Sequence, residues 1–237
     1  MNRILFEKDE ISGCVARCGG ARAEHILKVL HGEVGQRLKT GEVDGKVGSG
    51  KIISILPGGE VEIAVSHDEE GLPSWVDVIM APPRPRVMKR LLPQMAALGA
   101  GRIVLVGAKK VEKDFWGATL LKEENFRPLL IVGLMQSGTS ELPILETRRN
   151  FRRFLVEELD ALFPTRNRVV AHPYGAQAAA ESASGRLLLA IGPEGGWTDE
   201  EVELMESCGF SRYSLGGRIL RTDTATVALL SKLNKEK

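Results

Sequence analysis

The feature that most constrains the fold is a change of pattern near residue 75, where continuous apolar runs begin to alternate with helical stretches. The apolar runs stand at residues 75–81, 102–108, 167–173 and 185–193, and the helical stretches at 86–99, 123–138, 151–163 and 222–233. Strands buried on both faces have such continuous apolar sequences, and helices between them return the chain in parallel. The pattern predicts an α/β domain with a parallel sheet.

The first 70 residues show a different pattern, that of a small β domain. Short β-rich runs such as GKIISIL and EVEIAVS are separated by glycine-rich turns. One amphipathic helix is predicted at residues 21–32. Several short strands with tight turns are typical of a small barrel. The stretch DEEGLPSW (68–75) marks a boundary. The predicted domains are 1–70 and 75–237.

The composition argues against a membrane protein and favours a soluble protein of the cytoplasm. No window approaches roughly 18 uninterrupted apolar residues, and the polar start MNRILFEKDE does not resemble a signal peptide. Three cysteines, an odd number, suit a reduced compartment. Cys14 and Cys18 are separated by three residues, but no second pair of Cys or His stands at metal-ligand spacing. We therefore expect Cys14, Cys18 and Cys208 to be structural thiols and expect no metal site.

Basic residues gather in three stretches, although the net charge is only +1. These stretches are RPRVMKR (84–90), GAKKVEK (107–113) and TRRNFRRF (147–154). A local basic face can bind a phosphate backbone even in a nearly neutral protein. The alternative is a set of solvated faces, offset by acidic stretches such as HDEEG (67–71), and charge alone favours that alternative.

The loop after the last long apolar run, GPEGGWT (192–198), holds three glycines and a proline around one carboxylate. Open parallel sheets bind ligands at the carboxyl ends of their strands, and glycine lets a ligand approach the backbone closely. The loop matches neither a phosphate-binding nor a dinucleotide-binding motif, and Glu194 would repel a phosphate. A ligand that is neutral or cationic where it approaches fits better; the alternative is a tight connection with Glu194 in solvent. Thr198 and Glu201 stand at capping-box spacing, which predicts that a helix follows.

A second segment, YSLGGRILRTDTATVALL (213–230), suits an anionic partner. A short strand is expected to end at Leu215, where two glycines turn the chain. Arg218 and Arg221 flank two apolar residues, and Thr222 or the threonine two residues later is expected to cap the final helix. Arginines that snorkel at the surface are the alternative interpretation.

Together, IGPEGGWTDEEV and LGGRILRTDTA resemble the paired motifs of the ribosomal RNA small-subunit methyltransferase E family, in the SPOUT superfamily of S-adenosylmethionine-dependent RNA methyltransferases. A weaker likeness follows the family's order along the chain, for example in ALGAGRIVLV (97–106) and QSGTSELP (136–143). The resemblance implies an N-terminal PUA-like β-barrel that helps to hold RNA and a SPOUT domain with a C-terminal trefoil knot. It also implies a homodimer, and methylation of N3 of a uridine in 16S ribosomal RNA of the small ribosomal subunit.

The same resemblance implies that the two glycine-rich segments form the S-adenosylmethionine pocket. The implied cofactor-binding residues are His172, Pro173, Gly192, Pro193, Glu194, Gly195, Gly196, Leu215, Gly216, Ile219, Leu220 and Thr224. Arg221, and with it Arg218, would stabilise the anion that forms on the base, and Glu194 is a candidate general base. The residues expected to bind RNA are Arg3, Arg84, Arg86, Lys89, Arg90, Lys109 and Lys113.

The chain departs from the family's usual motifs at several positions. Thr139 follows QSG where an arginine is usual, and PQMAALG stands for QKATELG, so that Pro93, Gln94 and Ala97 differ. The cofactor motifs are nearly intact, so a methyltransferase with a different RNA target is one alternative. A non-catalytic RNA-binding protein and an α/β enzyme for a small anionic metabolite are two others. S-adenosylmethionine binding and methyl incorporation into RNA would separate them.

Overall fold

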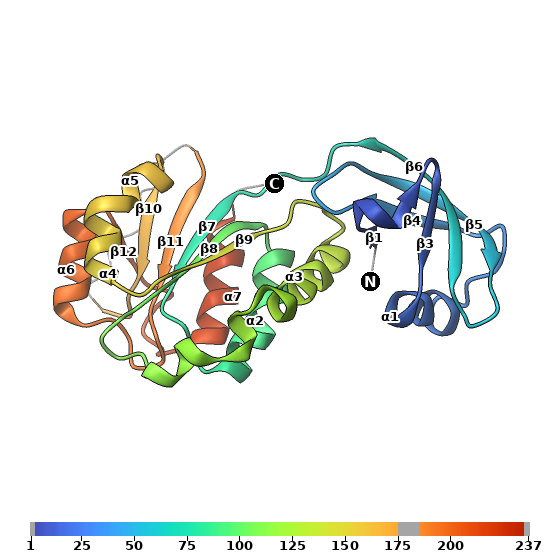
Figure 1. Cartoon of the computed structure of the whole chain (residues 1–237). Helices are drawn as coiled ribbons and strands as arrows, with labels where there is room; N and C mark the ends of the chain where they lie inside the picture. Colours follow the sequence, from blue (N-terminus) through green and yellow to red (C-terminus); the bar gives the residue numbers. More distant parts are fainter. Residues whose placement is uncertain (1–2, 175–184, 235–237) are drawn as a thin grey trace. The chain divides into compact units, whose positions relative to one another are not determined.

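The computed structural model describes residues 3–174 and 185–234 (Figure 1). Contacts between residues divide the chain into two compact units. Of the described residues, unit 1 comprises 3–73 and 131–142, and unit 2 comprises 74–130, 143–174 and 185–234. The chain therefore returns to the first unit after it has begun the second.

Unit 1 contains a six-stranded sheet with the strand order β1-β4-β5-β6-β3-β2. Its strands are β1 (Ile4–Phe6), β2 (Ile11–Ser12), β3 (Val15–Cys18), β4 (Arg37–Glu42), β5 (Val47–Ile55) and β6 (Val61–Glu69). β1 runs parallel to β4, and the other neighbours are antiparallel. No ladder joins β1 to β2 in the described residues, so this sheet is open, and the small barrel that the sequence predicted is not confirmed.

The helix of unit 1 is made of α1 (Gly20–Glu24) and the π-helical turn η2 (His25–Val29). It lies where the periodicity predicted a helix. Ala23 and Ile26 are buried on its inner face, and the N–H of Gly32 donates to the carbonyl of Ile26 where the helical stretch ends. Nearby, burial raises the pKa of the Cys18 thiol to about 11, so this thiol stays protonated at neutral pH.

Unit 2 contains a second six-stranded sheet, with the order β12-β10-β11-β7-β8-β9 and parallel pairing throughout. Its strands are β7 (Val76–Met80), β8 (Ala100–Val106), β9 (Ile144–Arg148), β10 (Arg168–Ala171), β11 (Leu187–Ile191) and β12 (Ser211–Tyr213). The predicted parallel sheet is thus present. β9 was missed, because it is an edge strand whose side chains are exposed or only partly buried and three of its five residues are polar.

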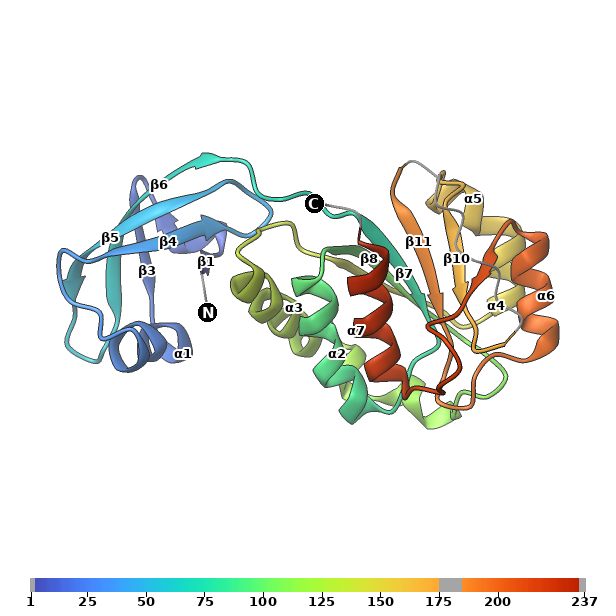
Figure 2. The same cartoon turned by 180° about the vertical axis from the view of Figure 1, so that it is seen from behind.

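Helices cover both faces of the unit 2 sheet. They are α2 (Pro85–Ala97), α4 (Phe151–Arg153) with the π-helical turn η5 (Phe154–Glu158), α5 (Leu159–Leu162), α6 (Asp199–Ser207) and α7 (Thr222–Leu233). A further helix, α3 (Glu123–Ser137), begins in unit 2 and ends in unit 1. α2 and α7 pack side by side on one face, while α4, α5 and α6 lie on the other (Figures 1 and 2). This is the layered arrangement that the alternating sequence pattern predicts.

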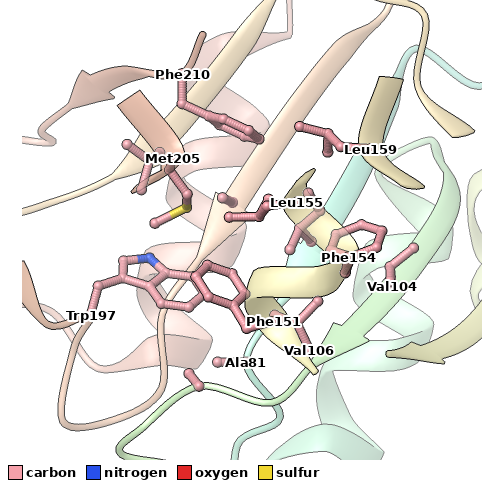
Figure 3. Close-up of a cluster of buried hydrophobic side chains, with 14 of the residues drawn as sticks. Ala81, Val104, Val106, Phe151, Phe154, Leu155, Leu159, Trp197, Met205 and Phe210 are labelled. Atoms are coloured by element: carbon pink, nitrogen blue, oxygen red, sulfur yellow. The ribbon is translucent and has the colours of Figure 1, made fainter. Parts of the chain in front are cut away.

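Alternate strand residues supply the core beneath α4–α6. Ile79, Val104 and Leu188 point into this cluster, and residues one step along each strand point to the opposite face. Phe151 of α4 stacks on Trp197, with ring centroids 5.4 Å apart and ring planes 21° apart (Figure 3). Since Trp197 belongs to the glycine-rich loop, this aromatic pair ties the loop to the core.

Two helix and strand ends differ from the sequence predictions. Pro93 lies inside α2, which runs from Pro85 to Ala97. β12 ends at Tyr213, two residues before the predicted end at Leu215. The N-cap of α7 is Arg221 and makes no side-chain capping bond; neither threonine caps the helix. The capping box of Thr198 and Glu201 is confirmed at the start of α6.

Candidate functional site

Four parallel strands of unit 2 end at the same edge of the sheet and bring their following loops together. β7, β11, β10 and β12 end at Met80, Ile191, Ala171 and Tyr213. Beyond them, the N–H of Ala81 donates to the carbonyl of Ile191 at 3.0 Å, and the N–H of His172 donates to that of Tyr213 at 3.0 Å. The two glycine-rich segments therefore lie at the carboxyl edge, where parallel sheets bind ligands.

The first glycine-rich segment turns tightly around Trp197. Gly196 has a φ of +69°, a conformation that favours glycine, and its N–H donates to the carbonyl of Pro193 at 2.8 Å. A Cβ on Gly192 would lie 3.2 Å from the indole of Trp197, so a side chain there would crowd the ring. Trp197 is buried, and its indole N–H has no hydrogen-bond partner in the described part of the chain.

Glu194 lies at the tip of this segment and is exposed. One of its carboxylate oxygens accepts a hydrogen bond from the backbone N–H of Arg84, 3.2 Å away. That N–H precedes α2, so the carboxylate connects the loop after β11 with the loop after β7. Glu194 thus remains open to solvent while its position is fixed.

Lys110 also holds the first segment, and sequence reasoning did not single it out. Its Nζ donates to the carbonyl of Gly195 at 2.9 Å and to that of Trp197 at 3.4 Å. Its stem packs on Gly195, whose added Cβ would lie 3.1 Å from the Lys110 Cδ. Only the basic run GAKK pointed to this position, and a basic run does not reveal which carbonyls a lysine will bind.

The second segment, residues 214–221, presents apolar and cationic side chains to solvent. Gly216 has a φ of +114°, and the Ser214 Oγ holds the turn through the Gly216 N–H at 3.1 Å. Large apolar side chains are exposed at Leu215 (38%), Ile219 (72%) and Leu220 (38%). Both predicted catalytic arginines, at positions 218 and 221, are exposed and make no ion pair with any other described residue.

The third strand end contributes His172, Pro173 and Tyr174. The Nδ1 of His172 lies 2.6 Å from the carbonyl oxygen of Tyr174, so the imidazole closes a local turn. The Ser214 Oγ donates to the carbonyl of Pro173 at 3.3 Å, which joins this turn to the second glycine-rich segment. Thr224 lies farther along, exposed in the first turn of α7.

Arg3, a predicted RNA-binding residue, has a structural environment in unit 1. Its half-buried guanidinium donates to the carbonyls of Gly138 (2.9 Å), Thr40 (2.7 Å) and Gly48 (3.0 Å). Burial lowers the pKa of this guanidinium, although Glu69 opposes the shift. The contacts give Arg3 the role of joining three backbone segments.

The other predicted RNA-binding residues divide into paired and unpaired cations. Arg90 is paired with Asp223 of α7 at 2.8 Å, and Lys109 with Glu200 of α6. The hydrogen bond from Lys109 holds the pKa of the Glu200 carboxyl below its usual value. The exposed cations with no ion pair among the described residues are Arg84, Arg86, Lys89 and Lys113.

The part of the chain that the structure describes holds neither a metal-ligating cluster nor a membrane-spanning helix. Within residues 3–174 and 185–234, no three His, Cys, Asp or Glu side chains gather where they could hold a metal ion. In the same residues no helix is long and apolar enough to cross a membrane.

The sheet edge and its glycine-rich loops match a known class of protein. A family model described as an RNA methyltransferase domain matches residues 70–234 of the chain. This match spans unit 2 and both glycine-rich segments. The chain therefore belongs to the class of proteins that contain an RNA methyltransferase domain.

One curated relative identifies the family within this class. Ribosomal RNA small subunit methyltransferase E of Treponema pallidum is 31% identical over 235 residues, which cover 96% of this chain and 88% of the relative. The chain belongs to the ribosomal RNA small subunit methyltransferase E family.

Two solved structures share the fold over 98% of this chain and 96% of their own. A methyltransferase of Legionella pneumophila, solved in complex with S-adenosylmethionine, is 24% identical with a TM-score of 0.77. Ribosomal RNA small subunit methyltransferase E of Neisseria gonorrhoeae, solved with S-adenosylmethionine, is 21% identical with a TM-score of 0.75.

Proposed function

We propose that this chain transfers a methyl group from S-adenosylmethionine to N3 of a uridine in 16S ribosomal RNA of the small subunit. The observation that carries the proposal is that the two glycine-rich segments follow β11 and β12 at the same carboxyl edge of the unit 2 sheet, in a member of this family. The printed names of the relatives favour small-subunit ribosomal RNA as the substrate. The two solved relatives with bound S-adenosylmethionine favour that cofactor.

The residues at the sheet edge fit S-adenosylmethionine. Among the described residues the buried indole N–H of Trp197 has no hydrogen-bond partner, and it lies beside Gly192, whose missing Cβ makes room for the indole. Exposed Leu215 and Leu220 provide apolar walls, and Glu194 provides negative charge that suits a cation. The residues that would hold the cofactor are His172, Pro173, Gly192, Pro193, Glu194, Gly195, Gly196, Leu215, Gly216, Ile219, Leu220 and Thr224. When bound, S-adenosylmethionine supplies an electrophilic methyl group on a cationic sulfonium.

The arginines of the second segment would act on the RNA base. Methylation at N3 would require this nitrogen to lose its proton, so negative charge would develop on the uracil. Arg221 and Arg218 are exposed and lack ion pairs with described residues, so their guanidinium groups are available to stabilise that charge. Glu194, a solvent-accessible carboxylate in the adjoining segment, is the candidate proton acceptor.

Four broader assignments belong to the same proposal. We assign unit 1 a PUA-like, RNA-holding role and unit 2 a trefoil knot, on the resemblance of the motifs and on family membership. We assign the chain to the cytoplasm, where ribosomal RNA would be its substrate. A homodimer would cover exposed Leu215, Ile219 and Tyr174, and light scattering of the purified protein measures the mass that distinguishes a dimer from a monomer.

The experiment replaces Arg221 with glutamine and measures methyl transfer to small ribosomal subunits that lack the modification. Removing one donor of a charge-stabilising site typically costs about 100-fold in kcat. We expect a loss of this size, with the S-adenosylmethionine affinity measured by calorimetry unchanged. Arg153→Gln removes an exposed arginine of unit 2 outside the segment, paired with Glu157, and is the matched control. Unchanged turnover in Arg221→Gln would remove the assigned role, and absence of transfer by the wild-type protein would leave only a non-catalytic binding protein.

A further inference from the structure

A cavity in unit 2 lies outside the proposed cofactor loops. It has a volume of about 520 Å³ and is lined by Gly107, Lys109, Arg149, Arg152, Glu200 and Glu201, among others. These residues come from the loop after β8, the connection from β9 to α4, and the first turn of α6. A cavity of this size can accept a nucleotide.

The two carboxylates of this cavity already have partners. Glu201 accepts hydrogen bonds from the backbone N–H of Lys109 at 2.7 Å and of Thr198 at 2.8 Å. Glu200 is paired with the Nζ of Lys109. Lys109 thus offsets one of the two negative charges, and the other carboxylate is engaged by backbone N–H groups. With Arg149 and Arg152 the lining carries three cations against two carboxylates, so its net charge is positive.

The run TRRNFRRF supplies these arginines, and the fold separates its four cations by role. Arg148 is paired with Glu158 at 2.7 Å, and Arg153 with Glu157 at 2.9 Å. Arg149 and Arg152 line the cavity instead. Neither makes an ion pair with another described residue, and Arg152 is exposed.

Arg149 is also held in place before any ligand arrives. Its guanidinium carbon lies 5.6 Å from the centroid of the Trp116 ring, and its Nη2 is 3.4 Å from the Trp116 carbonyl. A Cβ on Gly107 would lie 2.0 Å from the Arg149 carbonyl oxygen, so the two loops touch through their backbones at this point. The Arg149 side chain is thus held in position before a ligand binds, and such preorganisation favours phosphate binding.

We propose that this cavity binds a phosphate group and its attached nucleotide from the RNA strand that the chain methylates. The inference rests on the proposed function for the identity of the ligand. It adds a subsite distinct from the cofactor loops but next to them, because Lys109 lines the cavity and Lys110 holds Gly195 and Trp197. Two guanidinium groups without ion pairs among the described residues, beside carboxylates that already have partners, suit a phosphodiester rather than a cation or an apolar group.

The test compares Arg152→Gln with Arg153→Gln, which removes the same charge from the neighbouring position of the same helical stretch. Fluorescently labelled 16S ribosomal RNA is titrated with each full-length protein at several salt concentrations, and S-adenosylmethionine binding is measured by calorimetry. Arg152→Gln should bind RNA about tenfold more weakly. The slope of log affinity against log salt should fall by about 0.7, the value for one lost phosphate contact on a single strand. Arg152→Lys should restore most of the affinity.

The outcomes separate this proposal from the proposed function. Equal RNA binding by Arg152→Gln and Arg153→Gln, or weaker binding with an unchanged salt slope, would overturn the cavity proposal while methyl transfer could still be present. Wild-type protein that binds RNA through Arg152 but neither binds S-adenosylmethionine nor transfers a methyl group would support the cavity and overturn the function. An unchanged S-adenosylmethionine affinity in both variants is expected, because neither arginine contacts the cofactor loops.

Discussion

At the scale of single residues, Lys110 shows how the glycine-rich loop acquires a defined shape. Three glycines within five positions leave the backbone many conformations. The Nζ of Lys110 reaches the carbonyl of Gly195, 85 residues further along the chain, and also that of Trp197. Glu194 is fixed in turn by the Arg84 N–H. The loop is therefore shaped by hydrogen bonds from two neighbouring loops.

This arrangement predicts that Lys110→Met weakens cofactor binding. Methionine keeps the apolar stem that packs on Gly195 but removes the donor to both carbonyls. We expect a rise of about three- to tenfold in the S-adenosylmethionine Kd measured by calorimetry, the size of one lost hydrogen bond. Lys113→Met is the matched control, because Lys113 is exposed and has no ion pair in the described residues. Equal affinities of the two variants would contradict the role of Lys110.

At the scale of elements, α6 begins with the clearest local signal in the chain. Thr198 accepts from the N–H of Glu201 at 3.3 Å, and the Glu201 carboxylate accepts from the N–H of Thr198 at 2.8 Å. The same carboxylate binds the N–H of Lys109. The capping box thus joins α6 to the loop after β8 as well as satisfying the first turn of the helix.

Removing the cap should destabilise unit 2 without touching the proposed chemistry. Thr198→Ala is expected to lower the free energy of unfolding by about 1 kcal/mol, a typical cost of losing an N-cap side chain. Thr198→Ser retains the oxygen and should lose little stability. Thermal and chemical unfolding of the three proteins measures the difference, and a serine variant as unstable as the alanine variant would assign the effect to the lost methyl group.

At the scale of the whole molecule, the chain does not divide into two consecutive pieces. Residues 131–142 follow the start of unit 2 but belong to unit 1. There the Ser140 Oγ donates to the Gly45 carbonyl at 2.6 Å, and the Leu142 N–H donates to Asp44 at 2.7 Å. Thr139, where the family usually has an arginine, is buried and donates to the Leu72 carbonyl at 2.8 Å.

Arg3 joins the separate chain segments of unit 1, so replacing it should lower the stability of the folded protein. Its contact with Gly138 joins positions 135 residues apart, and it also holds two further carbonyls. Arg3→Met should lower Tm by about 5 °C, the shift expected for roughly 2 kcal/mol in a chain of this size. Hydrogen exchange should accelerate at residues 138–142 and not in α7. Arg17→Met, at an exposed position in the same unit, is the control; an unchanged Tm in Arg3→Met would instead favour the RNA-binding role predicted from sequence.

Much of the fold was predictable because its signals are local. The apolar runs, the span of α7 and the capping box of α6 each depend on residues within a few positions of one another. β9 and the hairpin of β2 and β3 escaped because short, partly exposed strands are stabilised by their neighbours rather than by their own sequences. The two glycine-rich segments were also recognisable from the sequence, because the glycines of each segment lie within a few positions of one another.

The sequence by itself determined the layered α/β architecture of unit 2 and the two permissive turns, since periodicity and the absence of a Cβ act within a segment. Only the tertiary structure decided which cationic side chains form ion pairs and which do not. In TRRNFRRF it pairs Arg148 and Arg153 with glutamates and leaves Arg149 and Arg152 on a cavity wall. It also makes Arg3 a structural residue through carbonyls from distant segments. The physical reason is that an ion pair or a hydrogen bond depends on which groups folding brings within about 3 Å, whatever their separation along the chain.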